Sequence, residues 1–298
     1  MKKKTQPSVY DIATGRIIAL LEAGVAPWRK PWSGSSQSLA PMNYQSKRPY
    51  SGINFFLLSA CYDDPYFLTF HQVREMGGKV AAGARSAPVF FWKWLYKDAA
   101  GRLVPTREES TEQIPFLRYF PVFNAADIEG INFVYPPEAA LQPHERIGHC
   151  EALVASTGAR IEPHSYRASY SPALDRICMP ELQQFVCPQE YYATLFHELG
   201  HWTGHASRLG RFEPGDAPAA FGSAEYSREE LIAEMCAAFL CARCRIDTPE
   251  LTANSAAYLQ GWIQALRGDS RLVVTAAAQA QKAADLIAVG QASPQPHG

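Results

Sequence analysis

The chain has 298 residues, a length that suggests two domains of ordinary size, each able to bury its own core. Its seven cysteines are an odd number, and the opening Met-Lys-Lys-Lys is followed by polar residues. We therefore expect a cytoplasmic protein with reduced thiols and exclude a secreted disulfide scaffold. The apolar runs stay below the roughly eighteen residues of a membrane span, so we expect no membrane partner.

The formal net charge of −1 hides an uneven distribution along the chain. Residues 1–125 contain 16 Lys and Arg against 9 Asp and Glu, whereas residues 126–298 contain 12 against 20. The first part also holds 20 of the 35 Phe, Trp and Tyr residues. A basic, aromatic-rich part joined to an acidic part is typical of a binding domain linked to a catalytic domain. We place the two domains at residues 1–130 and 131–298.

The predicted elements begin with a helix that Ser8 opens and Gly24 ends, followed by the hexapeptide Pro-Trp-Arg-Lys-Pro-Trp at 27–32. Its prolines hold the hexapeptide extended, so two indoles and two cations are displayed with little freedom to lose on binding. Flat rings beside cations suit stacking with unpaired bases and contacts with phosphates. Alternatively, the tryptophans pin a loop onto the core.

Short helices are predicted over 52–62 and 69–76, and strands over 88–97 and 114–124 are predicted to form a long hairpin. Its aromatic residues belong to the core by default, while a basic face on the same sheet would suit a groove for single-stranded nucleic acid. Nothing in this part resembles a helix that reads the major groove or a glycine loop that binds phosphate. The candidate nucleic-acid-binding residues are Trp28, Arg29, Lys30, Trp32, Tyr44, Lys47, Arg48, Lys79, Arg85 and Lys93.

The second part is predicted to begin with a helix over 145–157 and short strands over 160–163, 165–171 and 175–179. We expect these strands to form the sheet beside a catalytic cleft, where a peptide can add as an extra strand. Tyr170 and Asp175 are candidates to face this cleft, with Tyr170 as a stabiliser of the transition state or as a plain packing residue.

The next helix carries His-Glu-x-x-His, formed by His197, Glu198 and His201. Residues four apart on a helix lie one turn above each other, so the two imidazoles can bind one metal while Glu198 lies beside them. A Zn²⁺ ion with an open coordination position lowers the pKa of its bound water to about 7, and the adjacent carboxylate can take the proton. The motif therefore predicts peptide hydrolysis, although a match of five positions also arises by chance.

A third ligand is needed, and the sequence offers competing candidates. His205 continues the ladder but lies about 12 Å along an unbroken helix from His197, too far to share a metal. A following helix offers Glu230 as the first choice and Glu229 as the next. Glu230 and Glu234 lie one turn apart, so one can bind the metal while the other orients a ligand histidine. However, Ser227 and Glu230 also form a capping-box pattern, which would assign Glu230 to the N-terminus of that helix.

The remaining elements complete the predicted catalytic domain. The segment 207–224 is rich in Gly and Pro and long enough to be a flap over the cleft. Helices over 250–267 and 270–289 are rich in Ala with apolar residues at core spacing, and we expect them to support the site.

With these motifs in hand, the chain resembles antirestriction proteins of the ArdC type from conjugative plasmids. Its N-terminal part is similar to a single-stranded-DNA-binding domain shared with TraC-type plasmid primases, through IIALLEAGVAPWRKPW, RPYSGIN, LTFHQVREMGGKV and PVFNAADIEGI. Its C-terminal part is similar to a zincin-like metallopeptidase domain, through YSPALDRICMP, FHELGHWTGH, FGSAEYSREELIAEMCAAFL and YLQGWIQAL. We therefore expect an α+β protein with an aromatic-rich DNA-binding domain and a gluzincin-like HExxH domain.

The resemblance implies a protein that binds single-stranded DNA entering a recipient cell and protects the plasmid from host restriction. It places a metal, Zn²⁺ with Mn²⁺ or another divalent ion as alternatives, on His197, His201 and Glu230, with Glu198 as the base. The protein substrate is unidentified, and the host restriction system is a candidate. The competing hypothesis is a protein that protects DNA by coating it, with the metal fold as scaffold. A nuclease is disfavoured, because two His and one Glu suit carbonyl attack better than the carboxylate-rich magnesium sites used on phosphodiesters.

Overall fold

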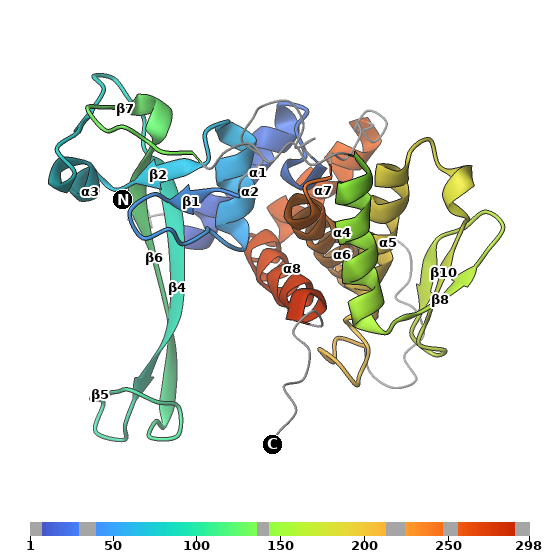
Figure 1. Ribbon diagram of the computed structural model, residues 1–298. Coiled ribbons are helices and arrows are strands. Elements are labelled where there is room, and N and C mark those ends of the chain that lie inside the picture. The colour runs from blue at the N-terminus through green and yellow to red at the C-terminus, as the bar shows by residue number, and fades with distance from the viewer. Residues whose placement is uncertain (1–7, 30–39, 136–142, 213–223, 247–255, 290–298) are drawn as a thin grey trace, which may run out of the picture.

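The computed structural model describes residues 8–29, 40–135, 143–212, 224–246 and 256–289. It combines a strand-rich N-terminal part with a helical C-terminal part, which confirms the predicted α+β class (Figure 1). The helices are α1 (Val9–Glu22), η1 (Pro27–Arg29), α2 (Ile53–Cys61), α3 (Phe70–Glu75), η2 (Ala125–Asp127), α4 (Pro143–Thr157), η3 (Leu182–Gln184), α5 (Pro188–Trp202), α6 (Ala224–Cys244), α7 (Ala256–Gly268) and α8 (Leu272–Val289). The strands are β1 (Met42–Asn43), β2 (Tyr66–Leu68), β3 (Lys79–Val80), β4 (Ala87–Lys97), β5 (Leu103–Val104), β6 (Glu112–Asn124), β7 (Ile128–Glu129), β8 (Arg160–Pro163), β9 (Ser169–Ser171) and β10 (Arg176–Met179).

The predicted hairpin is confirmed as the longest feature of the N-terminal part. β4 and β6 pair antiparallel from Ala87 with Val122 to Lys97 with Glu112. They lie in a five-stranded sheet of order β1-β2-β6-β4-β5, in which β1 and β2 cover only the end of β6 nearest the helices. Figure 1 shows the far end of the hairpin extending away from the helices as an arm. We call the β4–β6 hairpin the arm.

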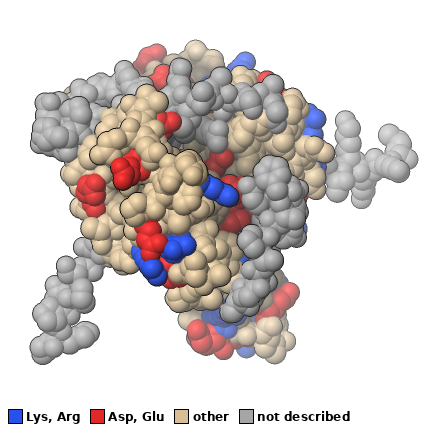
Figure 2. All heavy atoms as spheres, turned by 90° about the vertical axis from the view of Figure 1, so that its right-hand side faces the viewer, with Lys and Arg blue, Asp and Glu red and all other residues tan. Residues whose placement is uncertain are grey.

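The C-terminal part confirms the predicted strands and metal-motif helix. β8 and β10 pair parallel, β9 and β10 pair antiparallel, and α5 packs against β9 and β10. On the face of the molecule seen in Figure 2, acidic and basic side chains are interspersed among neutral ones. Ion pairs link β8 and β10, where Glu162 lies 2.8 Å from Arg176 and 2.5 Å from Arg160.

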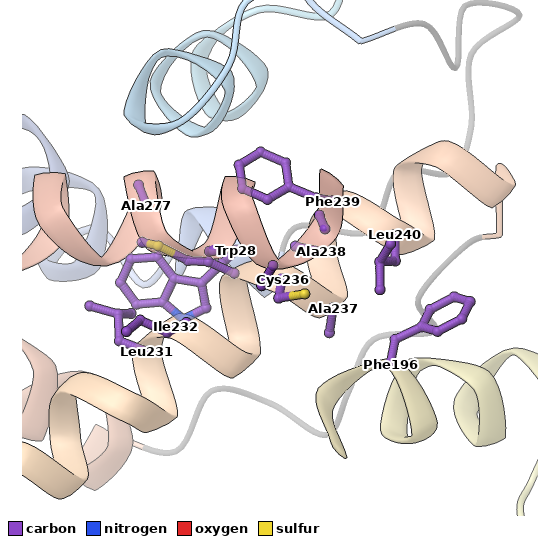
Figure 3. Close-up of a cluster of buried hydrophobic side chains, with 14 of the residues drawn as sticks. Trp28, Phe196, Leu231, Ile232, Cys236, Ala237, Ala238, Phe239, Leu240 and Ala277 are labelled. Atoms are coloured by element: carbon purple, nitrogen blue, oxygen red, sulfur yellow. The ribbon is translucent and has the colours of Figure 1, made fainter. Parts of the chain in front are cut away.

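A single large core joins the two parts, so the expectation that each buries a separate core is wrong. Ile17 of α1 and Phe56 of α2 are fully buried in the same cluster as residues of α5, α6, α7 and α8. Figure 3 shows Trp28 lying against Leu231 and Ile232 of α6. Among the described residues, two smaller clusters lie around the N-terminal sheet. The N-terminal helices α1 and α2 therefore belong to the same hydrophobic core as α6.

Helix α8 lies at the centre of this core. Its 18 residues have a mean hydropathy of 1.2, so by length and composition alone this helix could cross a membrane. Instead, it packs against α6 along a stripe of small side chains that allows the two helices to approach closely. The buried small residues of this stripe are Ala276, Ala277, Ala280, Ala283 and Ala284. This burial is typical of the core helix of a globular protein.

Candidate metal centre

Packing of α5 sets the direction of the metal motif. Pro188 occupies the first turn of the helix, where its fixed φ and missing N–H are tolerated. Leu195, Phe196 and Leu199 bury one side of α5 and are at most 1% exposed. Because this side is fixed in the core, His197 and His201 share another side of the helix, one turn apart.

Helix α6 approaches α5 closely at Gly200. A Cβ atom at Gly200 would lie 2.9 Å from the Cα of Ala233, a distance that real Cβ atoms do not show. The glycine therefore allows the backbones of α5 and α6 to come close enough for side chains of α6 to reach the histidines. The alternative of a capping box at Ser227 is wrong, since α6 begins three residues earlier at Ala224 and Glu230 lies beyond its first turn.

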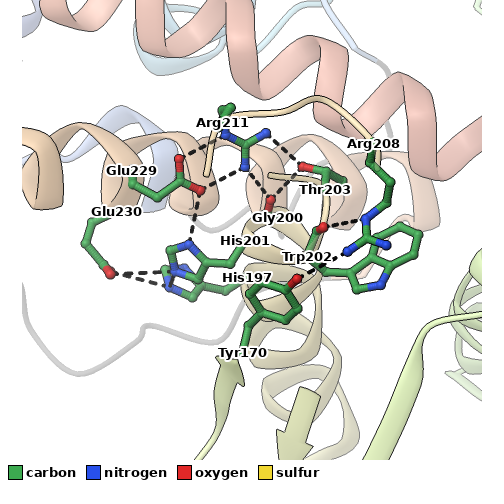
Figure 4. Close-up of polar contacts among 10 residues, drawn as sticks. All are labelled: Tyr170, His197, Gly200, His201, Trp202, Thr203, Arg208, Arg211, Glu229 and Glu230. Carbon is green, nitrogen blue, oxygen red and sulfur yellow. Dashed lines mark hydrogen bonds and ion pairs between the residues drawn. The ribbon is translucent and has the colours of Figure 1, made fainter. Parts of the chain in front are cut away.

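Three predicted ligands converge in the space between these helices (Figure 4). The Nε2 atoms of His197 and His201 lie 3.1 Å apart. The carboxylate of Glu230 lies 3.5 Å from Nε2 of His197 and 3.6 Å from Nε2 of His201. Ligands about 2.0–2.1 Å from a tetrahedral metal lie about 3.3 Å from one another, so this donor set fits a divalent cation such as Zn²⁺.

The neighbouring candidates take other positions. Glu229 faces the opposite nitrogen of His201, with 3.3 Å between its Oε1 and Nδ1 of the ring. The helix α5 ends at Trp202, and Nδ1 of His205 lies 2.8 Å from the hydroxyl of Ser207. Within the described residues, the side chains whose ligand atoms lie close enough together to hold one metal ion are those of His197, His201 and Glu230. The geometry therefore favours Glu230 over Glu229 and over His205 as the third donor.

The electrostatic environment of the centre is negative. Burial lowers the pKa of His197, but the contact with Glu230 and the nearby carboxylates of Glu198 and Glu234 outweigh it, so the pKa is raised. A histidine that attracts a proton in this way also attracts a metal cation. Glu198 is 7% exposed, whereas the side chains of His197 and Glu230 are 24% and 27% exposed. The side chains of His197 and Glu230 are therefore partly open to solvent, whereas Glu198 is buried.

Tyr170 and Asp175 belong to a neighbouring cluster. The phenol of Tyr170 donates a hydrogen bond to Oδ1 of Asp175 at 2.8 Å, and Arg208 donates to Oδ2 of Asp175 at 3.0 Å. The guanidinium of Arg208 also lies 3.9 Å from the centre of the Trp202 ring. Burial and the adjacent Asp175 raise the pKa of Tyr170. These contacts tie β9 and β10 to the end of α5, and a role for Tyr170 in the transition state stays a prediction.

Comparison with known proteins gives the same two parts. Residues 7–123 match a family model for the N-terminal domain of anti-restriction factor ArdC, and residues 148–279 match a zincin-like metallopeptidase model. The crystal structure of metal-free antirestriction ArdC protein from plasmid R388 is 35% identical with a TM-score of 0.75, covering 97% of this chain and 100% of that one. The chain belongs to the ArdC antirestriction family.

Further likenesses extend across most of this ArdC-family chain. The R388 ArdC protein with Mn(II) bound is 36% identical with a TM-score of 0.74, over 97% of this chain and 100% of that one. An uncharacterized protein of Sinorhizobium fredii, y4eC, is 35% identical over 98% of this chain and 95% of its own length. Two DNA primases named TraC from Escherichia coli are 34% and 35% identical over 93% of this chain, which spans only 20% and 27% of their lengths.

Two aromatic residues predicted to stack on DNA are buried in this ArdC-family protein. Trp28 is 4% exposed, and its indole N–H donates a hydrogen bond to the phenol of Tyr258 at 3.0 Å. Tyr44 is 8% exposed, and its phenol accepts a hydrogen bond from the backbone N–H of Val134 at 3.0 Å. Neither ring can stack on a base without leaving the core, so the prediction of stacking is wrong for both.

The predicted basic contacts vary in their surroundings. Arg48 and Arg85 are exposed. The ammonium of Lys47 lies 3.4 Å from the centre of the Tyr44 ring, and Lys79 forms an exposed ion pair of 2.9 Å with Glu129. Lys30 and Trp32 lie outside the described residues, as do the side chains of Arg29 and Lys93. The cationic part of the prediction is thus compatible with an accessible surface, and DNA contact by these residues stays a prediction.

Sequence reasoning missed an exposed aromatic surface on the arm. Phe91 and Phe120 are 49% and 46% exposed, although aromatics of the hairpin were assigned to the core by default. Phe91 pairs with Arg118 across the strands, so it shares a face of the sheet with Arg118 and Phe120. Arg118 is exposed and lies 4.8 Å from the Phe116 ring. We call Phe91, Phe116, Arg118 and Phe120 the arm face. The predicted strand 114–124 could have revealed this surface, because residues 116, 118 and 120 alternate along it and therefore point to the same face.

Proposed function

We propose that this protein is a divalent-metal-dependent peptide hydrolase that acts beside single-stranded DNA, in the cytoplasm of a recipient cell during conjugation. The observation that carries the proposal is the convergence of His197, His201 and Glu230 next to Glu198. The Mn(II)-bound structure of the R388 ArdC protein and the zincin-like family match support the choice of a metal-dependent reaction.

In this proposal His197, His201 and Glu230 hold the cation, and Glu198 acts as the general base. When bound, the cation supplies a Lewis acid that polarises the peptide carbonyl and makes a water acidic enough to attack it. Glu198 accepts a proton from the attacking water as the new C–O bond forms. The same carboxyl then gives the proton to the amine as the C–N bond breaks, which returns Glu198 to its starting state. The buried position of Glu198 keeps this proton from exchanging freely with solvent.

Binding of single-stranded DNA is assigned to the arm face and the exposed basic residues around Lys47, Arg48 and Arg85. Aromatic rings that stack with bases, beside cations that contact phosphates, are the usual means of gripping an unpaired strand. The match to the N-terminal ArdC domain and the similarity to the TraC primases support a DNA partner. The DNA would then bring the hydrolase close to a protein of the host restriction system, which is the proposed substrate.

The test compares Glu198→Gln with Glu190→Gln, a carboxylate in the first turn of the same helix and outside the metal centre. We expect Glu198→Gln to bind Mn²⁺ and single-stranded DNA as the unchanged protein does. Cleavage of a purified host restriction enzyme, followed by electrophoresis, should fall by about 10²–10⁴-fold. Glu190→Gln should retain cleavage. Full cleavage by Glu198→Gln would contradict the proposed role.

The second candidate is protection by coating, with the metal fold as a scaffold, and the exposure of the arm face favours it. This function predicts that Glu198→Gln keeps full antirestriction in a conjugation assay that compares restricting and non-restricting recipients. It also predicts that the triple change Phe91→Ala, Arg118→Ala and Phe120→Ala abolishes protection. If the triple variant binds single-stranded DNA with unchanged affinity and unchanged salt dependence, the arm face is not the binding surface.

A further inference from the structure

The segment after α5 folds back on the end of that helix and fixes the position of Arg211. The N–H groups of Arg211 and Phe212 both donate to the carbonyl of Gly204, at 2.8 and 2.9 Å. Leu209 donates to the carbonyl of Thr203 at 3.0 Å. A Cβ atom at Gly204 would lie 2.5 Å from the Phe212 ring, so the close fold requires glycine at this position.

The side chain of Arg211 then reaches between α5 and α6. Its Nε donates to Oε2 of Glu229 at 2.9 Å, and its Nη2 donates to Oε1 at 2.8 Å, forming a two-point contact. Two further N–H groups donate to the carbonyl of Gly200 at 2.7 Å and to the hydroxyl of Thr203 at 3.0 Å. The side chain of Arg211 is only 10% exposed. Charge-assisted two-point contacts fix the orientation of a carboxylate as well as its charge.

The fixed carboxylate faces a candidate metal ligand from behind. Oε1 of Glu229 lies 3.3 Å from Nδ1 of His201, while Nε2 of the same ring faces His197 and Glu230. A carboxylate can only accept a hydrogen bond, so the proton of a neutral His201 belongs on Nδ1. The lone pair on Nε2 is then directed at the space where the three donors converge (Figure 4).

We propose that Arg211 is a positioning residue of the metal centre, which holds Glu229 in the orientation that fixes the tautomer and direction of His201. This inference rests on the proposed metal centre but not on peptide hydrolysis. Partners that orient a ligand histidine typically contribute about 10- to 100-fold to metal affinity. A residue that only fastened the segment 204–212 to α5 would leave both the tautomer and the intrinsic affinity unchanged.

The experiment uses the full chain with Glu198→Gln as background, so that hydrolysis plays no part in the result. Arg211→Met removes the contacts, Arg211→Lys keeps the charge with a single contact point, and Glu229→Gln weakens the acceptor. Arg208→Lys is the matched control, because Arg208 lies in the same segment, is 13% exposed and contacts Asp175. Calorimetric titration with Mn²⁺ gives the affinity, and ¹⁵N chemical shifts of the histidine rings in metal-free protein give the tautomer of His201.

We expect Mn²⁺ to bind about 10- to 100-fold more weakly to Arg211→Met, and less so to Arg211→Lys, with the control unchanged. The His201 ring should lose its preference for the Nδ1–H form in Arg211→Met and Glu229→Gln. If Arg211→Met fails to fold, the other two variants carry the same test. Unchanged affinity and tautomer in the variants would overturn the inference while leaving the metal centre in place. Failure of the background protein to bind Mn²⁺ would instead overturn the metal centre, and with it the inference.

Discussion

The contact between α5 and α6 at Gly200 makes a sharp prediction for Gly200→Ala. The new Cβ would lie 2.9 Å from Cα and 3.3 Å from Cβ and the carbonyl oxygen of Ala233, so the two helices must separate by several tenths of an ångström. Overpacking of this kind costs about 1–3 kcal/mol. Alanine is more favourable than glycine within a helix, which stabilises the folded state by about 1 kcal/mol. We therefore expect a net loss of about 0–2 kcal/mol in the free energy of unfolding.

Gly261→Ala is the matched control, because Gly261 is an exposed helical glycine of α7 with no atom within 4 Å of its would-be Cβ. It should gain up to about 1 kcal/mol in urea unfolding. The metal centre adds a second measurement, since separation of α5 from α6 lengthens the distances from Glu230 to both histidines, now 3.5 and 3.6 Å. Calorimetry should show weaker Mn²⁺ binding for Gly200→Ala alone. Equal stabilisation by both substitutions, with equal Mn²⁺ affinity, would refute the close approach.

Two further predictions concern hydrogen bonds of Trp28 and Asp175, which lie outside the set of candidate metal ligands. Trp28→Phe removes the hydrogen bond that the indole N–H donates to Tyr258, while the phenol of Tyr258 still donates to Glu234. Urea unfolding should therefore show a loss of about 0.5–1.5 kcal/mol for this hydrogen bond, with affinity for single-stranded DNA unchanged. Hydrogen bonds from Arg208 lower the pKa of Asp175, so its contribution to stability is present above about pH 4 and is lost as the pH falls through the lowered value. Asp175→Asn should therefore flatten the decrease in unfolding free energy below pH 4, and an unchanged slope would contradict this pairing.

The elements of the fold were predictable because their signals are local. Ser8 accepts a hydrogen bond from the N–H of Asp11 while the Asp11 carboxylate accepts from Ser8, and the sequence alone indicated a helix start there. Gly24 has a φ of 85°, which explains why the predicted end of that helix was also placed well. His197 and His201 needed only the helical repeat to be brought together.

The remaining features depend on contacts that no local pattern contains. Trp28 is buried because Tyr258 and Trp262, more than 220 residues away, meet its ring. The prediction of an extended segment is wrong for its first three residues, which form the 3-10 helix η1, and the local sequence looks the same whether it contacts DNA or a core. The choice between Glu229 and Glu230 turns on one residue of register, which is about 100° around a helix. That register follows from the meeting of Gly200 with Ala233 across two helices.

The placement of α1 and α2 in the helical core determines where this protein can be divided. A fragment ending near residue 130 would leave the fully buried Ile17 and Phe56 facing water, and the complementary fragment would lose the cover over Phe239. Expression of the halves separately would thus compare two damaged molecules. The outer end of the arm lies away from the helices and can be shortened by linking β4 directly to β6, which would leave the helical core and the candidate metal centre intact.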